Sequence, residues 1–202
     1  MGMFVAALLL IGGQLVGGEF VYVVQPKDSL TSIGARLGVD ARVIAEANGL
    51  KTPARLQPGQ TFYNLHTAEN LKTVYWAEGE YIPESLAAIN HHLRDYRTGE
   101  VRDIDRRLLD VLCELRIRFE TKAHFELISG NRSPATNAML HSNSDGVAAH
   151  SLHIEGMAAD VRIPGRSPSL LKQAAISMKA GGVGYYPALQ FVHIDVGRVR
   201  TW

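Results

Sequence analysis

The chain has 202 residues, of which 46% are hydrophobic and 20% are charged, and its formal net charge is +1. This composition is typical of a globular protein with an ordinary core. The near-neutral charge provides no electrostatic reason to expect a nucleic-acid partner, and none is predicted. Cys113 is the only cysteine, so an intrachain disulfide is excluded.

Residues 1–18 form an apolar run that becomes rich in glycine after Ile11. The run is typical of an export signal, although no basic residue precedes Lys27. Gly and Gln interrupt it, which makes it marginal as a membrane span. We predict a signal-like or tether segment over residues 1–19. A buried first strand is the alternative.

Residues 20–66 are predicted to form a small module with the order strand, helix, helix, strand. The first strand covers residues 21–24, and the closing strand covers residues 61–64. Polar residues stand where they can cap the two helices. They are Asp28 or Ser29 for the first helix and Asp40 for the second.

This segment resembles a LysM domain, because YVVQPKDSLTSIGARLGVDARVIAEANGL and LQPGQTFY follow the consensus of that family. Lys27 departs from it, since the family often has Gly there. The resemblance implies binding of glycans that contain N-acetylglucosamine, such as peptidoglycan. It also implies a glycan groove lined by Asp28, Ser29, Leu30, Thr31, Gly49 and Leu50. A structural module without a ligand is the alternative.

Residues 67–202 are predicted to form a second domain. A helix is expected to begin at Pro83, and the clearest helix covers residues 103–121, where apolar residues recur at helical spacing. A strand over residues 125–128 is followed by a loop over residues 129–137 and a polar rim over residues 137–147. The last helix begins at Ser167 and Pro168.

The segment AHSLHIEGMAADVRI, residues 149–163, carries the strongest chemical signal. His153 and Asp160 are seven positions apart, which on a straight helix or strand is too far for both to reach one metal ion at about 2 Å. The chain must therefore turn between them. Gly156 allows that turn at little steric cost.

After the turn, residues 157–163 alternate like a strand that has Asp160 on its polar face. Residues 190–196 alternate in the same way, and His193 and Asp195 share the polar face. An unpaired buried carboxylate is costly, so an Asp in each of two apolar strands points to a metal site. On the pattern alone, ordinary strand residues with satisfied side chains remain an equal alternative.

The run HSLHIEGMAAD, residues 150–160, resembles the HSxHxxGxAxD signature of bacterial zinc peptidases. This group is related to the D-Ala-D-Ala metallopeptidases and to the lysostaphin and hedgehog-type domains. Three further segments resemble the MepK/YcbK-like murein endopeptidases in the same order: residues 93–101, 129–137 and 181–187. The resemblance covers roughly residues 70–202.

The resemblance implies an α+β fold, in which the LysM module precedes a hedgehog/D-Ala-D-Ala-peptidase-like domain with a mostly antiparallel sheet and flanking helices. It implies that His153, Asp160 and His193 bind Zn²⁺, whose fourth position would hold a water with a pKa near 7. Many relatives have an acid where this chain has Gln190. Asp195 is therefore the first candidate for the general base and His150 the second, although either could instead orient a ligand.

Two further residues are predicted to contact the substrate. The guanidinium of Arg132 can bind a carboxylate at two points, or it can brace its loop by an ion pair with Asp160 or Asp195. Tyr185 and Tyr186 lie just before the final strand, and either phenol could donate a hydrogen bond to an oxyanion. Tyr185 is the predicted contact, and aromatic packing is the alternative for at least one of the pair.

The sequence therefore predicts an exported, monomeric zinc peptidase of the periplasm or cell envelope, with a membrane tether at its N-terminus as the alternative to a removed signal. The LysM module would hold the enzyme on glycan while the zinc domain cuts peptide crosslinks of peptidoglycan. Two alternatives remain open. One is a zinc D-Ala-D-Ala carboxypeptidase, and the other is a non-catalytic peptidoglycan-binding protein.

Overall fold

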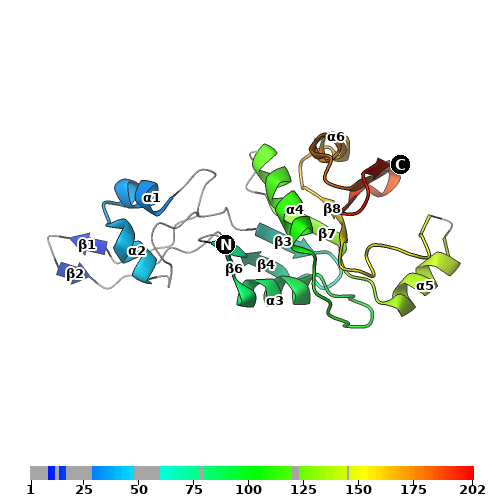
Figure 1. The fold of residues 1–202 in the computed structure, drawn as a ribbon, viewed down its shortest axis with the longest axis horizontal. Coiled ribbons are helices and arrows are strands. Elements are labelled where there is room, and N and C mark those ends of the chain that lie inside the picture. Colours follow the sequence, from blue (N-terminus) through cyan, green and yellow to red (C-terminus); the bar gives the residue numbers. More distant parts are fainter. Residues whose placement is uncertain are drawn as a thin grey trace. The chain divides into compact units, whose positions relative to one another are not determined.

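The computed structural model describes residues 9–11, 14–16, 29–47, 60–77, 80–119, 123–144 and 146–202 (Figure 1). The chain divides into two compact units. One contains Met1–Thr61 and Lys72–Leu86, and the other contains Phe62–Leu71 and Ala87–Trp202. Within the described ranges, every helix is too short or too polar to cross a membrane.

In the N-terminal unit, helices α1 (Leu30–Leu37) and α2 (Ala41–Ala47) form where they were predicted. Ser29 begins α1 with a capping box, because the Ser29 hydroxyl accepts from the Ser32 N–H and the Ser32 hydroxyl accepts from the Ser29 N–H. The helices share a buried apolar cluster: Leu30, Ile33, Val39, Ile44 and Ala45.

Two short strands, β1 (Leu9–Ile11) and β2 (Gln14–Val16), pair in antiparallel fashion within the apolar N-terminal run. The strand predicted over residues 21–24 lies outside the described residues. A second antiparallel pair in this unit joins β5 (Trp76–Ala77) to β6 (Glu80–Tyr81).

Strand β3 (Gln60–Asn64) is present where the closing strand was predicted. It pairs in parallel with β7 (Phe125–Ser129), and Phe62 stands opposite Phe125. Both phenylalanines are fully buried, with ring centroids 6.2 Å apart. The burial of this aromatic pair joins β3 to the large sheet.

The described residues contain one sheet of seven strands, in the order β11-β9-β10-β8-β7-β3-β4. The remaining strands are β4 (Asn70–Thr73), β8 (Ala158–Arg162), β9 (Gly182–Tyr186), β10 (Phe191–Asp195) and β11 (Arg200–Thr201). The strands β7, β8, β10 and β9 pair in antiparallel fashion, whereas β3 with β7 and β11 with β9 are parallel.

The sheet is therefore mixed, and the predicted mostly antiparallel sheet is wrong. The chain between β3 and β7 contains helices α3 (Pro83–His92) and α4 (Arg106–Arg118), and such a long connection allows two strands to run parallel. The prediction of a domain that combines helices with a sheet is confirmed.

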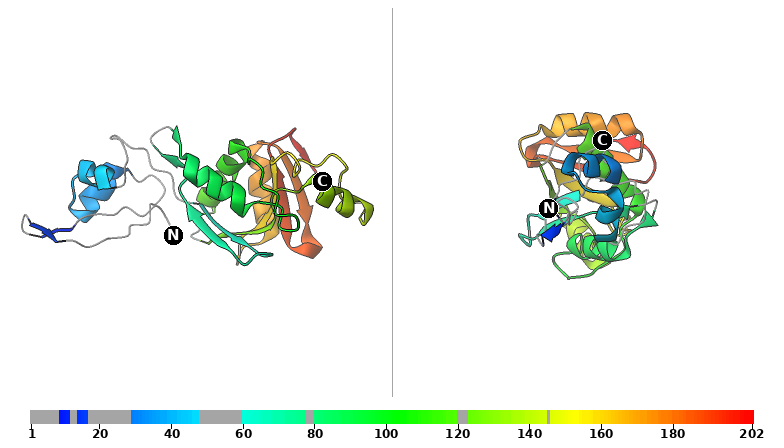
Figure 2. Two further views of the ribbon diagram at one scale, coloured as in Figure 1. Left: turned by 90° about the horizontal axis from the view of Figure 1, so that it is seen from below. Right: turned by 90° about the vertical axis from the view of Figure 1, so that its left-hand side faces the viewer.

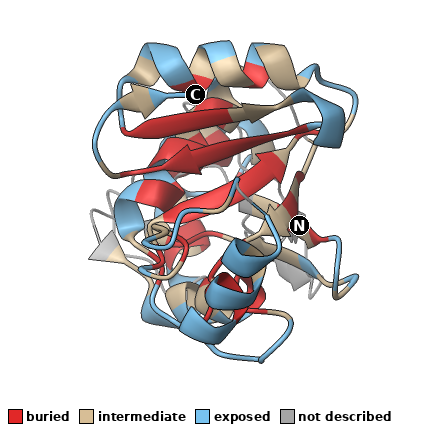
Figure 3. Ribbon diagram, turned by 90° about the vertical axis from the view of Figure 1, so that its right-hand side faces the viewer, coloured by how far each residue is buried: buried red, intermediate tan, exposed pale blue. Residues whose placement is uncertain are grey.

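Helices α4 and α6 (Pro168–Met178) supply much of the apolar packing of this domain. The orange helix α6 lies along β9 and β10 (Figure 2), and α4 packs against α6. Leu108, Leu112 and Leu115 of α4 are completely buried, as the helical spacing predicted. In Figure 3 the central strands of the sheet are buried, whereas the outer surfaces of the helices are exposed.

Helix α5 (Pro134–Ser142) was not predicted, because residues 129–147 were expected to be a loop and a polar rim. The hydroxyl of Ser133 caps this helix by accepting from the Thr136 N–H, and Pro134 is its first residue. The segment PATNAMLHS has no apolar stripe, so the only sequence signal was the Ser-Pro start.

Candidate metal centre

The centre of the site is a cross-strand pair. In the antiparallel pairing of β8 with β10, Asp160 stands directly opposite His193, between the buried pairs Val161–Val192 and Ala159–Ile194. Because side chains alternate along a strand, Asp160 and His193 project from the same face of the sheet. The predicted strand faces are therefore confirmed.

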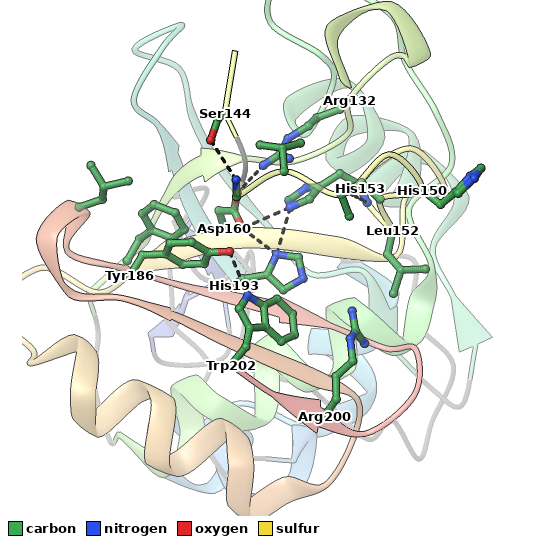
Figure 4. Close-up of a pocket in the computed structure, with 16 residues that line it drawn as sticks. Arg132, Ser144, His150, Leu152, His153, Asp160, Tyr186, His193, Arg200 and Trp202 are labelled. Atoms are coloured by element: carbon green, nitrogen blue, oxygen red, sulfur yellow. Dashed lines mark hydrogen bonds and ion pairs between the residues drawn. The ribbon is translucent and has the colours of Figure 1, made fainter. Parts of the chain in front are cut away.

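The turn predicted at Gly156 brings His153 to the same place. Gly156 has φ +69°, and a Cβ there would collide with the carbonyl oxygen of Asp103. The turn lets His153, which precedes it in the chain, approach the strand that follows it. His153 Nε2 lies 3.2 Å from Asp160 Oδ1 and 3.2 Å from His193 Nδ1 (Figure 4). All three side chains are buried, so the sequence-predicted ligands form one cluster.

The partners of the two imidazoles determine which of their nitrogens carry protons. His153 Nδ1 lies 2.7 Å from the carbonyl oxygen of Gly130, and His193 Nε2 lies 3.1 Å from a carboxylate oxygen of Asp195. Both of these partners only accept hydrogen bonds, so these nitrogens are the donors. In the neutral rings, His153 Nε2 and His193 Nδ1 are then acceptors.

Three acceptor atoms therefore face one another, since Asp160 Oδ1 lies 2.9 Å from His193 Nδ1 and 3.2 Å from His153 Nε2. A proton can link two of these atoms, but only a metal ion satisfies all three. Ligands about 2.1 Å from a tetrahedral zinc ion lie about 3.4 Å from one another, which is close to the observed separations. The donor set fits a divalent metal.

Charge and burial act against each other in this cluster. Burial lowers the pKa of His153, and the nearby Asp160 only partly offsets this effect. Burial also opposes ionisation of Asp160, but His153 and His193 outweigh it and lower the carboxyl pKa. His193 is flanked by Asp160 and Asp195, which raise its pKa despite burial. The carboxylate is therefore ionised and ready to bind a cation.

Arg132 is held against Asp160 in the structure. Its Nη2 donates to Asp160 Oδ2 at 2.6 Å, and its Nε donates to the Ser129 hydroxyl at 2.9 Å. Asp160 thus uses one oxygen for the cluster and the other for Arg132. This is the structural ion pair that the sequence left open as an alternative to binding a substrate carboxylate.

Asp195 lies behind His193, on the side away from Asp160. Its side chain is fully buried and accepts hydrogen bonds from His193 Nε2, the backbone N–H groups of Gly182 and Gly197, and both terminal nitrogens of Arg200. Burial would raise the carboxyl pKa, but these donors lower it well below its usual range. The carboxylate orients His193, and both of its oxygens are engaged in these hydrogen bonds.

Comparison with known proteins agrees with this geometry. Residues 55–202 match the family described as peptidoglycan L,D-endopeptidase MepK, and residues 22–63 match the LysM domain family. The chain is 46% identical over 142 residues to peptidoglycan L,D-endopeptidase MepK of Escherichia coli, which covers 70% of this chain and 78% of the relative. The chain belongs to the MepK family.

Other relatives agree with this assignment. The protein of the same name from Shigella flexneri is also 46% identical over 142 residues, again 70% of this chain and 78% of the relative. A probable peptidoglycan L,D-endopeptidase MepK from Haemophilus influenzae is 39% identical over 143 residues, which covers 70% of this chain and 77% of the relative. No solved structure gives a significant match.

In this MepK-family chain, the ligand cluster opens into a pocket of about 390 Å³. His150, the second candidate base, lines the pocket and is exposed, and Figure 4 shows its imidazole turned away from the cluster. Several lining residues were not predicted as site residues: Leu152, Phe191, Arg200 and Trp202.

The predicted substrate contact Tyr185 is not among the pocket residues, and Tyr186 takes its place. In the pairing of β9 with β10, Gly184 stands opposite His193, so Tyr186 shares the face of His193 while Tyr185 projects to the other side. There Lys172 Nζ lies 4.9 Å from the centre of the Tyr185 ring. Tyr185 therefore lies on the opposite face of the sheet from the ligand cluster, and Tyr186 is the tyrosine beside that cluster.

The predicted glycan-binding residues fall into three groups. Asp28, Gly49 and Leu50 lie outside the described residues. Thr31 is exposed, and Ser29 is engaged in the capping box of α1. Leu30 is 2% exposed and belongs to the core of the module, which contradicts its predicted place in a groove. As the first residue of α1, its side chain faces α2 and not the solvent.

Proposed function

We propose that this protein is a zinc-dependent peptidoglycan endopeptidase that cleaves a peptide bond between residues of L and D configuration. The observation that carries the proposal is the convergence of His153 Nε2, Asp160 Oδ1 and His193 Nδ1, within 3.2 Å of one another, at the floor of a pocket. The bond type follows from the names of the relatives, which are peptidoglycan L,D-endopeptidases.

Zinc, when bound by these three residues, supplies a Lewis acid that lowers the pKa of a water and polarises the scissile carbonyl. The chain itself fixes the donor atoms. The carbonyl of Gly130 and the carboxylate of Asp195 hold the two imidazoles in the required tautomers, and Arg132 holds the Asp160 carboxylate. Each ligand is thus oriented by a partner before the metal binds.

We choose between the two candidates for the general base, Asp195 and His150, by asking which side chain can reach the pocket. Asp195 was the first candidate, but its oxygens are occupied by five hydrogen bonds behind His193, so we assign it a positioning role. His150 lines the pocket and is exposed, and an exposed side chain changes rotamer readily. We therefore assign to His150 the acceptance of the proton of the attacking water.

The ion pair of Arg132 with Asp160 favours cleavage of crosslinks over trimming of chain ends. A carboxypeptidase needs a cation free to hold the terminal carboxylate of its substrate, whereas this guanidinium already binds Asp160 and Ser129. The presence of the complete ligand set disfavours a protein that only binds peptidoglycan.

The two-part organisation fits a tethered enzyme. We propose that residues 20–66 form a LysM module that holds the chain on peptidoglycan glycan, and that residues 67–202 form the catalytic domain. We further propose an exported monomer in the periplasm or cell envelope. Residues 1–19 would direct export and could remain as a membrane tether.

Digestion of purified peptidoglycan by the full chain tests this function. The zinc-loaded protein is expected to convert crosslinked dimers to monomers, with the new termini identified by mass spectrometry. A chelator and His153→Ala should abolish the conversion, while His124→Ala serves as a matched control, since that histidine lies outside the site. Release of single alanine residues would indicate a carboxypeptidase. Intact crosslinks in the presence of bound zinc would contradict the proposal.

A further inference from the structure

Tyr186 presents its phenol to the pocket from the same face of the sheet as His193. Its ring stacks on that of Phe191, its cross-strand partner, with centroids 4.6 Å apart and an angle of 18° between the planes. Both residues line the pocket with the three metal ligands. Figure 4 shows the phenol oxygen directed toward Trp202 and the ligand cluster. The ring is therefore fixed in place beside the cluster.

The hydroxyl of Tyr186 accepts a hydrogen bond from the indole Nε1–H of Trp202 at 3.0 Å. An indole nitrogen can only donate, so the phenol oxygen is the acceptor in this contact. The proton of the phenol is not used there, and the hydroxyl makes no other hydrogen bond within the described part of the chain. Accepting one hydrogen bond also strengthens a hydroxyl as a donor.

Trp202 is held by several independent contacts. Its backbone N–H donates to the Val183 carbonyl at 3.2 Å, and its carbonyl accepts from the Tyr185 N–H at 3.1 Å. Its ring packs 5.2 Å from that of His193, and the guanidinium of Arg200 lies 4.8 Å from the ring centre. The indole N–H thus has a defined direction although half of the side chain is exposed.

The two arginines that line the pocket are already engaged in ion pairs. Arg132 is paired with Asp160, and Arg200 with Asp195. The serine hydroxyls that line the pocket, Ser144 and Ser151, lie on the irregular segment between α5 and β8. Tyr186 is thus a hydroxyl presented by the sheet itself, with a proton available for a ligand.

We propose that Tyr186 is a catalytic residue that donates a hydrogen bond to the carbonyl oxygen of the scissile amide, and that Trp202 is the residue that positions it. This inference rests on the proposed function. As the water oxygen bonds to the carbonyl carbon, the π electron pair of the carbonyl moves onto its oxygen, where the phenol O–H stabilises the new charge. The carbonyl re-forms when the C–N bond breaks, and the amine leaves with the proton given up by the water. The phenol keeps its proton throughout.

Kinetics on a purified crosslinked muropeptide dimer test the proposal in the zinc-loaded full chain. Tyr186→Phe removes only the hydroxyl and should lower kcat about 100-fold with KM and zinc content unchanged. Tyr185→Phe, the neighbouring tyrosine on the opposite face of β9, is the matched control and should match the wild type. Trp202→Phe should lower kcat about 10-fold, and the double variant should be no slower than Tyr186→Phe alone.

A second measurement detects the hydrogen bond between Trp202 and Tyr186 independently of catalysis. The chain contains two tryptophans, so the ¹⁵N-labelled protein gives two indole N–H signals in NMR, and Trp202→Phe identifies one of them. That signal should shift upfield in Tyr186→Phe and stay in place in Tyr185→Phe. This test distinguishes loss of the contact from loss of fold.

The outcomes separate this proposal from the proposed function. Tyr186→Phe with wild-type kcat, or with lowered zinc content, would overturn the catalytic role of the phenol. Additive losses in the double variant would overturn the positioning role of Trp202. A wild-type protein that binds zinc and cleaves no crosslinked substrate would overturn the proposed function and this proposal with it.

Discussion

His193 stands directly opposite Asp160 in the pairing of β10 with β8, and its Nδ1 lies 2.9 Å from Asp160 Oδ1. The register of this pairing is fixed by the buried apolar pairs on either side of it, Val192 with Val161 and Ile194 with Ala159. A slip of one residue would turn His193 away from the pocket. The geometry of the candidate metal centre therefore depends on hydrophobic packing of the sheet as much as on the three residues that form it.

The carboxylate of Asp195 is expected to control metal affinity through His193. In Asp195→Asn, one acceptor oxygen becomes an NH₂ donor among the donors of Arg200, Gly182 and Gly197, so the imidazole loses its fixed orientation. Zinc affinity should fall about 10–100-fold in a competition titration with a chelating dye. Glu114→Gln, which changes a half-exposed carboxylate on α4, is the control. Unchanged affinity with abolished cleavage would restore Asp195 as the general base.

The turn at Gly156 should be sensitive to a single methyl group. Gly156→Ala combines an unfavourable positive φ with a collision against Asp103, and should lower the free energy of unfolding by about 2–5 kcal/mol. Gly165 has a similar φ of +72° but open space around its Cα. Gly165→Ala should therefore cost only about 1–2 kcal/mol and leave zinc binding unchanged. If denaturant titrations showed that Gly156→Ala and Gly165→Ala lower the free energy of unfolding equally, the collision with Asp103 would not contribute to the cost.

Asp95 anchors the loop that holds His153. Its carboxylate accepts from the backbone N–H groups of Ser133 at 2.8 Å and Arg97 at 2.9 Å, and its side chain is buried. Asp95→Asn replaces one acceptor by a donor that faces an N–H group. The free energy of unfolding should fall by about 2–3 kcal/mol, measured by urea denaturation of the metal-free protein. Arg132→Lys, which leaves both backbone hydrogen bonds intact, should be less destabilising. An unchanged free energy of unfolding in Asp95→Asn would contradict the anchoring role.

His92 should make the domain sensitive to mild acid. Burial lowers the pKa of this histidine to about 4, against 6.5 for an ordinary side chain. Above pH 6.5 both the folded and unfolded states keep it neutral, and its full contribution to stability is present. As the pH falls from 6.5 toward 4, only the unfolded state binds the proton, and up to about 3 kcal/mol of stability is lost.

Replacement of this residue tests that expectation. In His92→Leu, the free energy of unfolding should fall less steeply between pH 7 and pH 4 than in the wild type. The measurement uses metal-free protein, so that competition between protons and metal at the ligands does not contribute. His91→Gln changes the exposed neighbour and should keep the wild-type slope. Parallel pH profiles for the wild type and His92→Leu would refute the assignment.

The sequence alone identified what local pattern and residue chemistry decide. The candidate ligands His153, Asp160 and His193 followed from a turn glycine, strand alternation and a specific motif, and all three meet in space. The capped helices also followed, because a cap such as Ser29 acts on backbone groups only three residues away. Helix α5 was not predicted because its sequence has no apolar stripe. Its only local signals are the capping residue Ser133 and the first helical residue Pro134.

Only the tertiary structure decided how separate segments align. Alternation within β9 shows that Tyr185 and Tyr186 face opposite ways, but the choice between them required the register against β10. The parallel pairing of β3 with β7 and the ion pair of Arg132 with Asp160 likewise join residues far apart in the chain. Such contacts are selected by burial of apolar surface over the whole sheet, which no local pattern contains. The sequence by itself indicated which groups could bind a metal, and the packing of the sheet decided which groups surround them.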